Sequence, residues 1–259
     1  MSEKRYYSSF TDDFEQTKEQ AYKLPEGYKW IRTDIFSKFL SGLTYGLAVI
    51  LGGIYCKAVL HISFKGRKNL KSVKGGFFVY GNHTQPFGDV VIPAIGLLPK
   101  RIYTVVSPAN YGIPFIGKIL PFLGALPIAD SLHGMKELNK AMETRLNKNH
   151  PIVIYPEAHV WKYYTGIRPF ADTSFKFPVK FQKPAFAMTV TYRKGKFFKK
   201  PITKVYLDGP FYPSGNTLKE KTADLHGKIY SQMLKRSENS NYAYIEYIKT
   251  EEKITTNKF

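Results

Sequence analysis

The chain has 259 residues, of which 43% are hydrophobic and 23% are charged, a composition that is typical of a folded protein and excludes a disordered one. Its 39 lysines and arginines against 20 aspartates and glutamates give a net charge of +19. We therefore expect a polyanionic partner, either nucleic acid or the anionic surface of a membrane. The single cysteine, Cys56, excludes an internal disulfide framework.

Residues 1–35 are mostly polar and predict a loose or peripheral N-terminal arm. They precede an apolar helical segment, residues 36–61, in which the stretch FLSGLTYGLAVILGGIYC carries no charge and lies between Lys38 and Lys57. A helix that crosses a bilayer needs about twenty such residues, so this segment is at the lower limit. A buried core helix is one interpretation. The basic residues at both ends favour a helix that lies on or enters a membrane. A membrane partner would also explain the net charge more simply than nucleic acid.

Residues 62–235 show strand-like and helix-like patterns in alternation, which predicts an α/β domain. The expected helices cover residues 89–98, about 131–150 and 217–235, with apolar side chains at three- and four-residue spacing in the last two. The expected strands are apolar or β-branched runs at residues 75–81, 101–107, 151–156, 185–192 and 202–207. The predicted fold is a mixed, largely parallel central sheet flanked by helices. Residues 236–259 would form a C-terminal tail with a short helix.

The first candidate site is the loop at residues 81–89, GNHTQPFGD. The proline and glycine within it predict a compact turn, so that Asp89 can fold back toward His83. A carboxylate bound to one imidazole nitrogen fixes the tautomer, and the other nitrogen can then remove a proton from a hydroxyl or water. From the spacing alone the alternative is favoured, a turn in which Asn82 and Asp89 shape the backbone and His83 is a surface histidine.

The second candidate site is the loop at residues 155–162, YPEAHVWK, directly after an apolar strand. Glu157, His159 and Lys162 occur close together there, and loops at the carboxyl ends of strands often form ligand sites in α/β sheets. A solvated loop is the alternative. A third segment, residues 110–130, is rich in glycine, proline and apolar residues and contains Lys118. It could line a groove for an alkyl chain, or it could be an ordinary connection.

The sequence contains none of the common motifs for metal binding, nucleotide binding or a serine nucleophile. There is no CxxC pair, no His-x3-His spacing, no Walker A loop and no GxSxG nucleophile motif. We therefore expect neither a metal site nor a cofactor.

The order of these segments resembles the glycerolipid acyltransferase family that includes the 1-acylglycerol-3-phosphate acyltransferases (PlsC-like). The resemblance covers residues 62–207, more than half of the chain. Matching blocks, in the family's order, are Gly66-x-x-Asn69-Leu70, Asn82-His83 with Asp89, Ile113-Pro-Phe-Ile-Gly117 with residues 123–129, Ile152-Val-Ile-Tyr-Pro-Glu157, and Arg168-Pro-Phe170 with residues 183–190.

The resemblance implies that His83, oriented by Asp89, deprotonates a hydroxyl that then attacks the thioester of acyl-CoA or acyl-carrier protein, without an acyl-enzyme. It implies a membrane-associated enzyme at the cytoplasmic face, with membrane lipids and a thioester donor as partners and no nucleic acid. The residues expected to contact substrate are Asn82, Lys118, Glu157, His159, Lys162 and Arg168.

The chain departs from the family pattern at three places. Five residues separate His83 from Asp89, where the family has four. Ala129-Asp130 and the stretch at residues 158–160 stand where the family has phosphate-binding arginines. A non-catalytic lipid-binding member of the same fold is therefore the alternative function.

Overall fold

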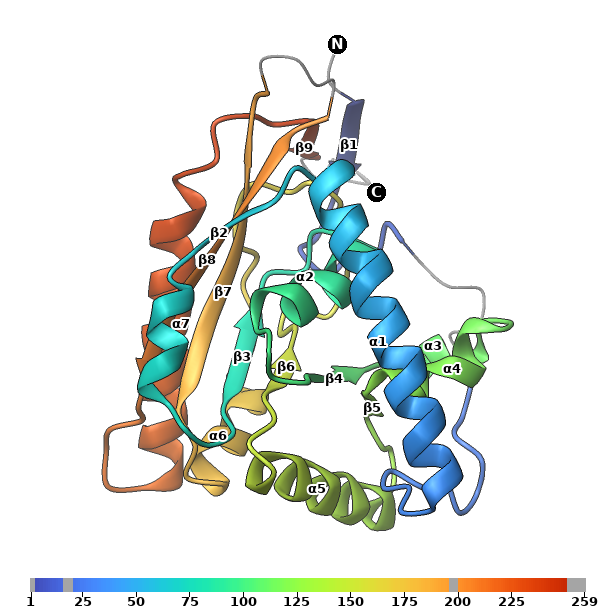
Figure 1. Ribbon diagram of the computed structural model, residues 1–259. Helices are drawn as coiled ribbons and strands as arrows, with labels where there is room; N and C mark the ends of the chain where they lie inside the picture. Colours follow the sequence, from blue (N-terminus) through green and yellow to red (C-terminus); the bar gives the residue numbers. More distant parts are fainter. Residues whose placement is uncertain (1–2, 16–20, 196–199, 251–259) are drawn as a thin grey trace, which may run out of the picture.

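The computed structural model of the protein describes residues 3–15, 21–195 and 200–250. Within them, seven strands form the central sheet in the order β2-β8-β7-β3-β6-β4-β5 (Figure 1). Only the pairing of β7 with β8 is antiparallel among the pairings described, which confirms the predicted mixed, largely parallel sheet. The strands are β2 (Ser63–Lys65), β3 (Phe78–Gly81), β4 (Tyr103–Val106), β5 (Ala125–Pro127), β6 (Ile152–Ile154), β7 (Ala185–Arg193) and β8 (Ile202–Phe211).

Helices cover both faces of this sheet. One face packs against α5 (Leu132–Asn147), α6 (Lys176–Lys180) and α7 (Leu218–Ser237), and the other packs against α1 (Ile35–Ala58) and α2 (Gly88–Gly96). Successive β3 residues therefore enter different cores, Phe78 on the α5–α7 side and Val79 on the α1–α2 side. Burial on both faces explains why the strands read as continuous apolar runs. The shorter helices are α3 (Ala109–Gly112), α4 (Ile116–Leu123), η1 (Arg67–Ser72) and η2 (Thr173–Phe175).

The long helices begin at side chains that cap them. The side chain of Asp34 accepts a hydrogen bond from the backbone N–H of Ser37 at the start of α1, and Ser131 caps α5. Thr217 and Glu220 form a capping box at the start of α7. Each cap satisfies a backbone donor that the first helical turn leaves without a partner. The helices at α5 and α7 confirm the sequence predictions to within a few residues.

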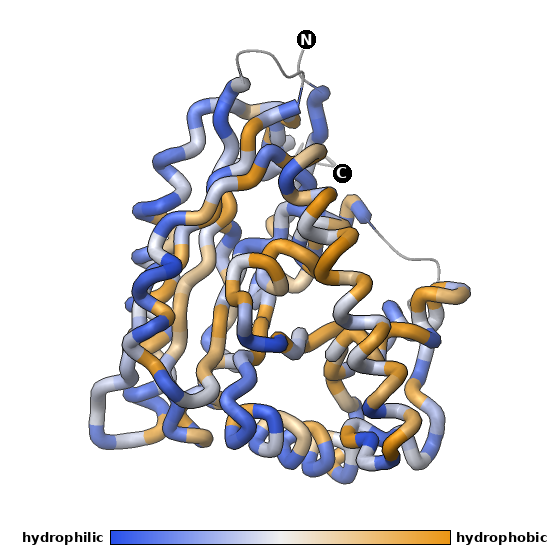
Figure 2. Tube along the Cα trace, in the orientation of Figure 1, coloured by the Kyte–Doolittle hydropathy of each residue, from blue (hydrophilic) through white to orange (hydrophobic). Residues whose placement is uncertain are grey.

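Helix α1 leaves most of its surface outside the core. It is, among the described residues, the one helix long and apolar enough to cross a membrane, and only 11% of its most apolar window is buried. The buried-core interpretation of this segment is therefore wrong. Hydrophobic colour covers much of α1 and α4 in Figure 2. The exposed apolar side chains of α1 are Ile35, Phe36, Phe39, Leu43, Leu47, Ile50, Leu51 and Ile54.

Polar contacts nevertheless tie one side of α1 to the domain. The Arg101 guanidinium donates to the Ser41 hydroxyl at 2.6 Å and lies over the Tyr45 ring. The Tyr45 hydroxyl accepts a hydrogen bond from the backbone N–H of Ile102 at 3.1 Å. The helix is thus docked along the domain and does not project away from it (Figure 1).

The ends of the chain differ from the prediction of a loose arm and a helical tail. β1 (Glu3–Tyr7) pairs in parallel with β9 (Ile245–Lys249), so the segment expected to be a helix contains a strand. The Trp30 indole donates to the carbonyl of Pro127 at 3.0 Å, which fastens the arm to the domain. The strand pairing at both ends was missed because each strand has its partner at the opposite end of the sequence. Residues 1–2, 16–20 and 251–259 of these segments lie outside the described residues.

Candidate active site

His83 lies just beyond the carboxyl end of β3, which occupies an interior position in the sheet between β7 and β6. Its loop leads directly into α2, whose first turn contains Asp89. The second predicted loop follows β6, the neighbouring parallel strand. Because the carboxyl ends of parallel strands meet at one edge of the sheet, the two candidate loops lie next to each other, as the sequence predicted.

Asp89 reaches His83 in spite of the additional loop residue. The Nδ1 atom of His83 lies 2.7 Å from Oδ2 of Asp89. The backbone makes this possible with one helix-like turn, in which the N–H of Asp89 donates to the carbonyl of Gln85 at 2.8 Å. The N–H of Gln85 in turn donates to Oδ2 of Asp89 at 2.9 Å. Gly88 permits the tight turn, because a Cβ there would lie 2.6 Å from Cβ of Gln85.

The environment of this pair suits a general base. Asp89 is buried, and desolvation raises the pKa of its carboxyl group, although the bond to His83 opposes this effect. When Asp89 is ionised, its carboxylate only accepts hydrogen bonds, and Nδ1 of His83 then carries the proton while Nε2 is left as the basic nitrogen. The His83 side chain keeps 20% of its surface exposed, whereas that of Asp89 keeps 2%. The imidazole is thus the member of the pair that a substrate can reach.

Tyr155 orients both members of the pair. Its ring stacks on the His83 imidazole, with the ring centroids 4.6 Å apart. Its hydroxyl donates to the backbone carbonyl of Asp89 at 2.6 Å. The ring fits against the end of β3 because residue 81 is glycine, where a Cβ would lie 2.6 Å from the Tyr155 ring. One side chain from the second loop therefore positions the histidine and the start of α2 together.

Glu157 and Arg168 form a buried ion pair beneath the histidine loop. Oε2 of Glu157 accepts from the Arg168 guanidinium at 3.1 Å and from the backbone N–H of His83 at 3.2 Å. Oε1 of Glu157 accepts from the backbone N–H of Arg168 at 3.1 Å. Burial raises the pKa of Glu157, and the Arg168 charge and these N–H donors oppose that rise. The pair holds the two loops together from inside the protein.

The N-terminal arm braces this pair from the other side. The Arg168 guanidinium donates to the backbone carbonyls of Phe10 and His159. The Trp161 indole donates to the carbonyl of Asp12 at 2.8 Å, and the Trp161 backbone N–H donates to the carbonyl of His83 at 3.0 Å. Residues 3–15 are therefore connected to the histidine loop through Trp161.

Two long-range contacts join the histidine loop to β7. The Asn82 side chain donates to the carbonyl of Val190 at 3.0 Å and accepts from its N–H at 2.8 Å. The Tyr192 hydroxyl lies 2.7 Å from Oγ1 of Thr84 and accepts from the Gln85 side chain at 3.1 Å. These groups are buried, so each hydrogen bond satisfies a polar atom that water cannot reach.

Three residues that we expected to contact substrate are buried and have other roles. Asn82, Glu157 and Arg168 are 1%, 6% and 1% exposed, and they make the protein contacts described above. In this structure the three side chains support the loop from inside, and a contact of any of them with substrate stays a prediction.

The other expected substrate ligands lie nearer the surface. Lys118 is exposed on α4, and Lys162 is partly exposed. Nδ1 of His159 lies 3.2 Å from Oδ2 of Asp13, so this histidine is linked to the N-terminal arm. No hydrogen bond or ion pair between described residues joins these three side chains to the His83 imidazole.

Sequence patterns did not single out Tyr192, and they placed Tyr155 and Trp161 in the second candidate loop without assigning either of them a positioning role. Tyr155 directly precedes Pro156-Glu157 and could have been found from that position. Tyr192 is separated from Thr84 by 108 residues, and no local signal connects them.

Comparisons with known proteins identify the family and the fold of this chain. A family model described as Acyltransferase matches residues 61–203, a span that contains His83, Asp89 and Glu157. The fold is similar to that of the crystal structure of the 1-acyl-sn-glycerophosphate (LPA) acyltransferase, PlsC, from Thermotoga maritima. That match has 13% sequence identity and a TM-score of 0.51, and it covers 80% of this chain and 98% of that chain. None of the curated protein sequences matches this chain.

Proposed function

Since this chain belongs to the acyltransferase family, we propose that it transfers a fatty acyl group from acyl-CoA or acyl-carrier protein to a hydroxyl of a lysophospholipid or related amphipathic acceptor. The observation that carries this proposal is the 2.7 Å contact between His83 and Asp89 inside the matched region. It favours catalysis over the alternative of a lipid-binding member without activity.

The proposed reaction needs no covalent intermediate on the protein. Nε2 of His83 removes the proton of the acceptor hydroxyl while its oxygen attacks the thioester carbonyl carbon. The carbon–sulfur bond breaks, an ester forms, and the departing thiolate takes the proton back from the imidazolium. Asp89 stabilises the imidazolium that exists between these transfers. Backbone N–H groups near the loop would stabilise the negative oxygen of the intermediate.

Membrane association would bring the enzyme to its acceptor. The exposed apolar side of α1 continues onto α4, where Phe115, Ile116 and Ile119 are exposed as well. We propose that this surface lies in the interface of a membrane, with the docked side of α1 facing the domain. The basic chain would favour the cytoplasmic face, whose anionic lipids attract positive charge.

The acceptor need not be lysophosphatidic acid (LPA), after which the Thermotoga maritima acyltransferase is named. The family resemblance predicts phosphate-binding arginines at residues 129–130 and 158–160, but this chain has no arginine at either place. The first arginine after residues 158–160, Arg168, is committed to Glu157. A neutral or differently charged head group is therefore part of the proposed acceptor class.

The test compares the wild-type chain with His83→Ala and with His133→Ala, a matched control at an exposed histidine on α5. Purified proteins are assayed for thiol release from acyl-CoA with a panel of lysolipids, and lipid extracts of expressing cells are compared by mass spectrometry. We expect His83→Ala to lose about 10²–10⁴-fold in kcat while its circular dichroism and Tm match those of the wild type. The acylated lipid that disappears identifies the product.

Two results would contradict the proposal. Unchanged turnover by folded His83→Ala would exclude the general-base mechanism. Lysolipid binding by the wild type with no turnover on any thioester donor would support the lipid-binding alternative.

A further inference from the structure

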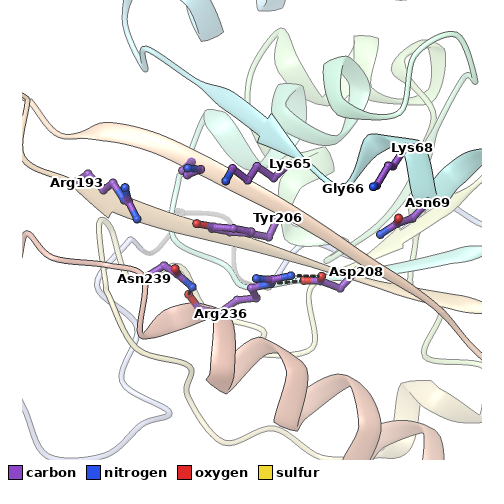
Figure 3. Close-up of a pocket in the computed structure, with 10 residues that line it drawn as sticks. Lys65, Gly66, Lys68, Asn69, Arg193, Tyr206, Asp208, Arg236 and Asn239 are labelled. Atoms are coloured by element: carbon purple, nitrogen blue, oxygen red, sulfur yellow. Dashed lines mark hydrogen bonds and ion pairs between the residues drawn. The ribbon is translucent and has the colours of Figure 1, made fainter.

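A hollow lies away from His83, at the edge of the sheet formed by β2 and β8 and beside the end of α7 (Figure 3). Its volume is about 440 Å³. Lys204, Tyr206 and Asp208 alternate along β8 with Val205 and Leu207, which pack into the core on the α1–α2 side. The hollow therefore opens on the α7 side of the sheet, whereas His83 and Asp89 lie on the α1–α2 side. Nothing in the proposed acyl transfer accounts for it.

The lining of this hollow is strongly positive. Five cationic side chains contribute to it, and one carboxylate does, that of Asp208. The cations are Lys65, Lys68, Arg193, Lys204 and Arg236.

The single carboxylate is already neutralised. Arg236 holds Asp208 with two hydrogen bonds, from Nε at 2.8 Å and from a terminal nitrogen at 2.6 Å (Figure 3). Among the described residues no other carboxylate forms an ion pair with a cation of the hollow. Lys65, Lys68, Arg193 and Lys204 therefore contribute positive charge that the protein itself does not balance.

Two of these cations are also partly withdrawn from water. Nε of Arg193 is buried and has no hydrogen-bond partner among the described residues. Desolvation, together with the charges of Lys65 and Arg193, lowers the pKa of Lys204. Gathering like charges in this way opposes folding, because each charge destabilises its neighbours. An anion bound in the hollow would neutralise this charge and so reduce the repulsion between the cations.

We propose that this hollow binds a phosphate group carrying more than one negative charge, either a phosphomonoester or a diphosphate. Several converging cations suit the oxygens of phosphate, and guanidinium is well matched to them. Tyr206 is only 5% exposed, and its ring centroid lies 4.7 Å from the Arg236 guanidinium and 5.8 Å from the Lys204 ammonium group, so the ring offers little surface on which a nucleobase could stack. The polar lining does not suit an alkyl chain. The ligand is thus recognised by its phosphate, on a soluble metabolite or on a lipid head group.

The test measures binding of inorganic pyrophosphate by calorimetry to the wild type and to Arg193→Gln/Lys204→Gln. The matched control is Lys136→Gln/Lys140→Gln, which removes the same charge from exposed positions of α5. A third variant, Lys65→Gln/Lys68→Gln, changes only exposed side chains of the hollow and so keeps the test valid if the first variant fails to fold. We expect at least about tenfold weaker binding in both hollow variants and little change in the control.

Vesicles distinguish the two sources of phosphate. Wild type and hollow variants are compared on vesicles of phosphatidylcholine with and without phosphatidic acid. Loss of both pyrophosphate and phosphatidic-acid binding assigns the hollow to a lipid head group, and loss of pyrophosphate binding alone assigns it to a soluble compound. The proposal is overturned if the wild type does not bind pyrophosphate, if the hollow variants bind it as the wild type does, or if the control loses as much. None of these results depends on whether His83 is catalytic.

Discussion

Oε2 of Glu157 accepts a hydrogen bond from the backbone N–H of His83 at 3.2 Å, although 74 positions separate the two residues in the sequence. The same oxygen accepts from the Arg168 guanidinium. One buried carboxylate thus fixes the backbone of the histidine loop to the neighbouring loop. The catalytic geometry proposed for His83 depends on this internal support as well as on Asp89.

Replacing Arg168 tests the importance of the buried pair. Arg168→Met would leave Glu157 buried without its cation, so we expect the free energy of unfolding to fall by about 3–5 kcal/mol. The matched control is Lys228→Met, which breaks the Lys228–Asp224 pair, whose side chains are 37% and 30% exposed. That change should lower the free energy of unfolding by no more than about 1 kcal/mol. Urea denaturation measures both, and equal losses would contradict a supporting role for Arg168.

Replacing Asp89 tests the orientation of His83. In Asp89→Asn the amide can donate to Nδ1 of His83, which moves the ring proton to Nε2 and removes the basic nitrogen from the substrate side. We expect kcat to fall by about 10²–10⁴-fold with the fold intact. Asp172→Asn, at an exposed aspartate, is the control and should keep full activity. A Michaelis constant that rises while kcat is unchanged would instead indicate a binding role for Asp89.

Burial raises the pKa of Asp89 above its ordinary value of 3.8, and this predicts a pH dependence of stability. The folded state binds the Asp89 proton more tightly than the unfolded state does. The protonated Asp89 side chain therefore stabilises the folded state fully below the ordinary pKa. This stabilisation is lost as the pH rises through the pKa that Asp89 has in the folded state. The free energy of unfolding of the wild type, relative to that of Asp89→Asn, should thus decrease as the pH is raised from about 3.5.

Asp34 supplies a control of opposite sign for this measurement. Hydrogen bonds from Ser37, first of all from its backbone N–H, lower the pKa of Asp34. The ionised Asp34 side chain stabilises the folded state above the ordinary pKa, and this stabilisation is lost as the pH falls. The free energy of unfolding of the wild type, relative to that of Asp34→Asn, should therefore increase with pH. Urea denaturation at a series of pH values measures both differences. The same slope for the two variants would contradict the assignment for Asp89.

Charges on the exposed side of α1 should weaken membrane binding. Leu43→Asp and Leu47→Asp place carboxylates on the apolar surface without changing the docked side, and each should weaken partitioning into anionic vesicles by about tenfold or more. Leu234→Asp, at an exposed leucine of α7 on the other face of the sheet, is the matched control. Sedimentation with vesicles measures the three variants. A loss as large for Leu234→Asp as for the α1 variants would exclude α1 as the membrane surface.

Local patterns in the sequence were sufficient to predict the helices at α5 and α7, the strand preceding His83 and the mixed sheet. Helical periodicity and caps depend on residues three or four positions apart, and a strand buried on both faces reads as an apolar run. The ordered motifs also identified His83 and Asp89 as a candidate pair. The prediction failed at the chain ends, because β1 and β9 pair across almost the whole length of the sequence.

The sequence by itself determined the family, the basic charge, the apolar composition of α1 and the residues that could perform acid–base chemistry. Only the tertiary structure decided that Asp89 reaches His83, that Glu157 and Arg168 support the loop from inside, and that Tyr155 and Tyr192 position it. It also brought together the cations of the hollow beside β2 and β8, which come from β2, β7, β8, η1 and α7. The physical reason is that burial and contact depend on the order of strands in the sheet, and that order brings together side chains more than a hundred residues apart.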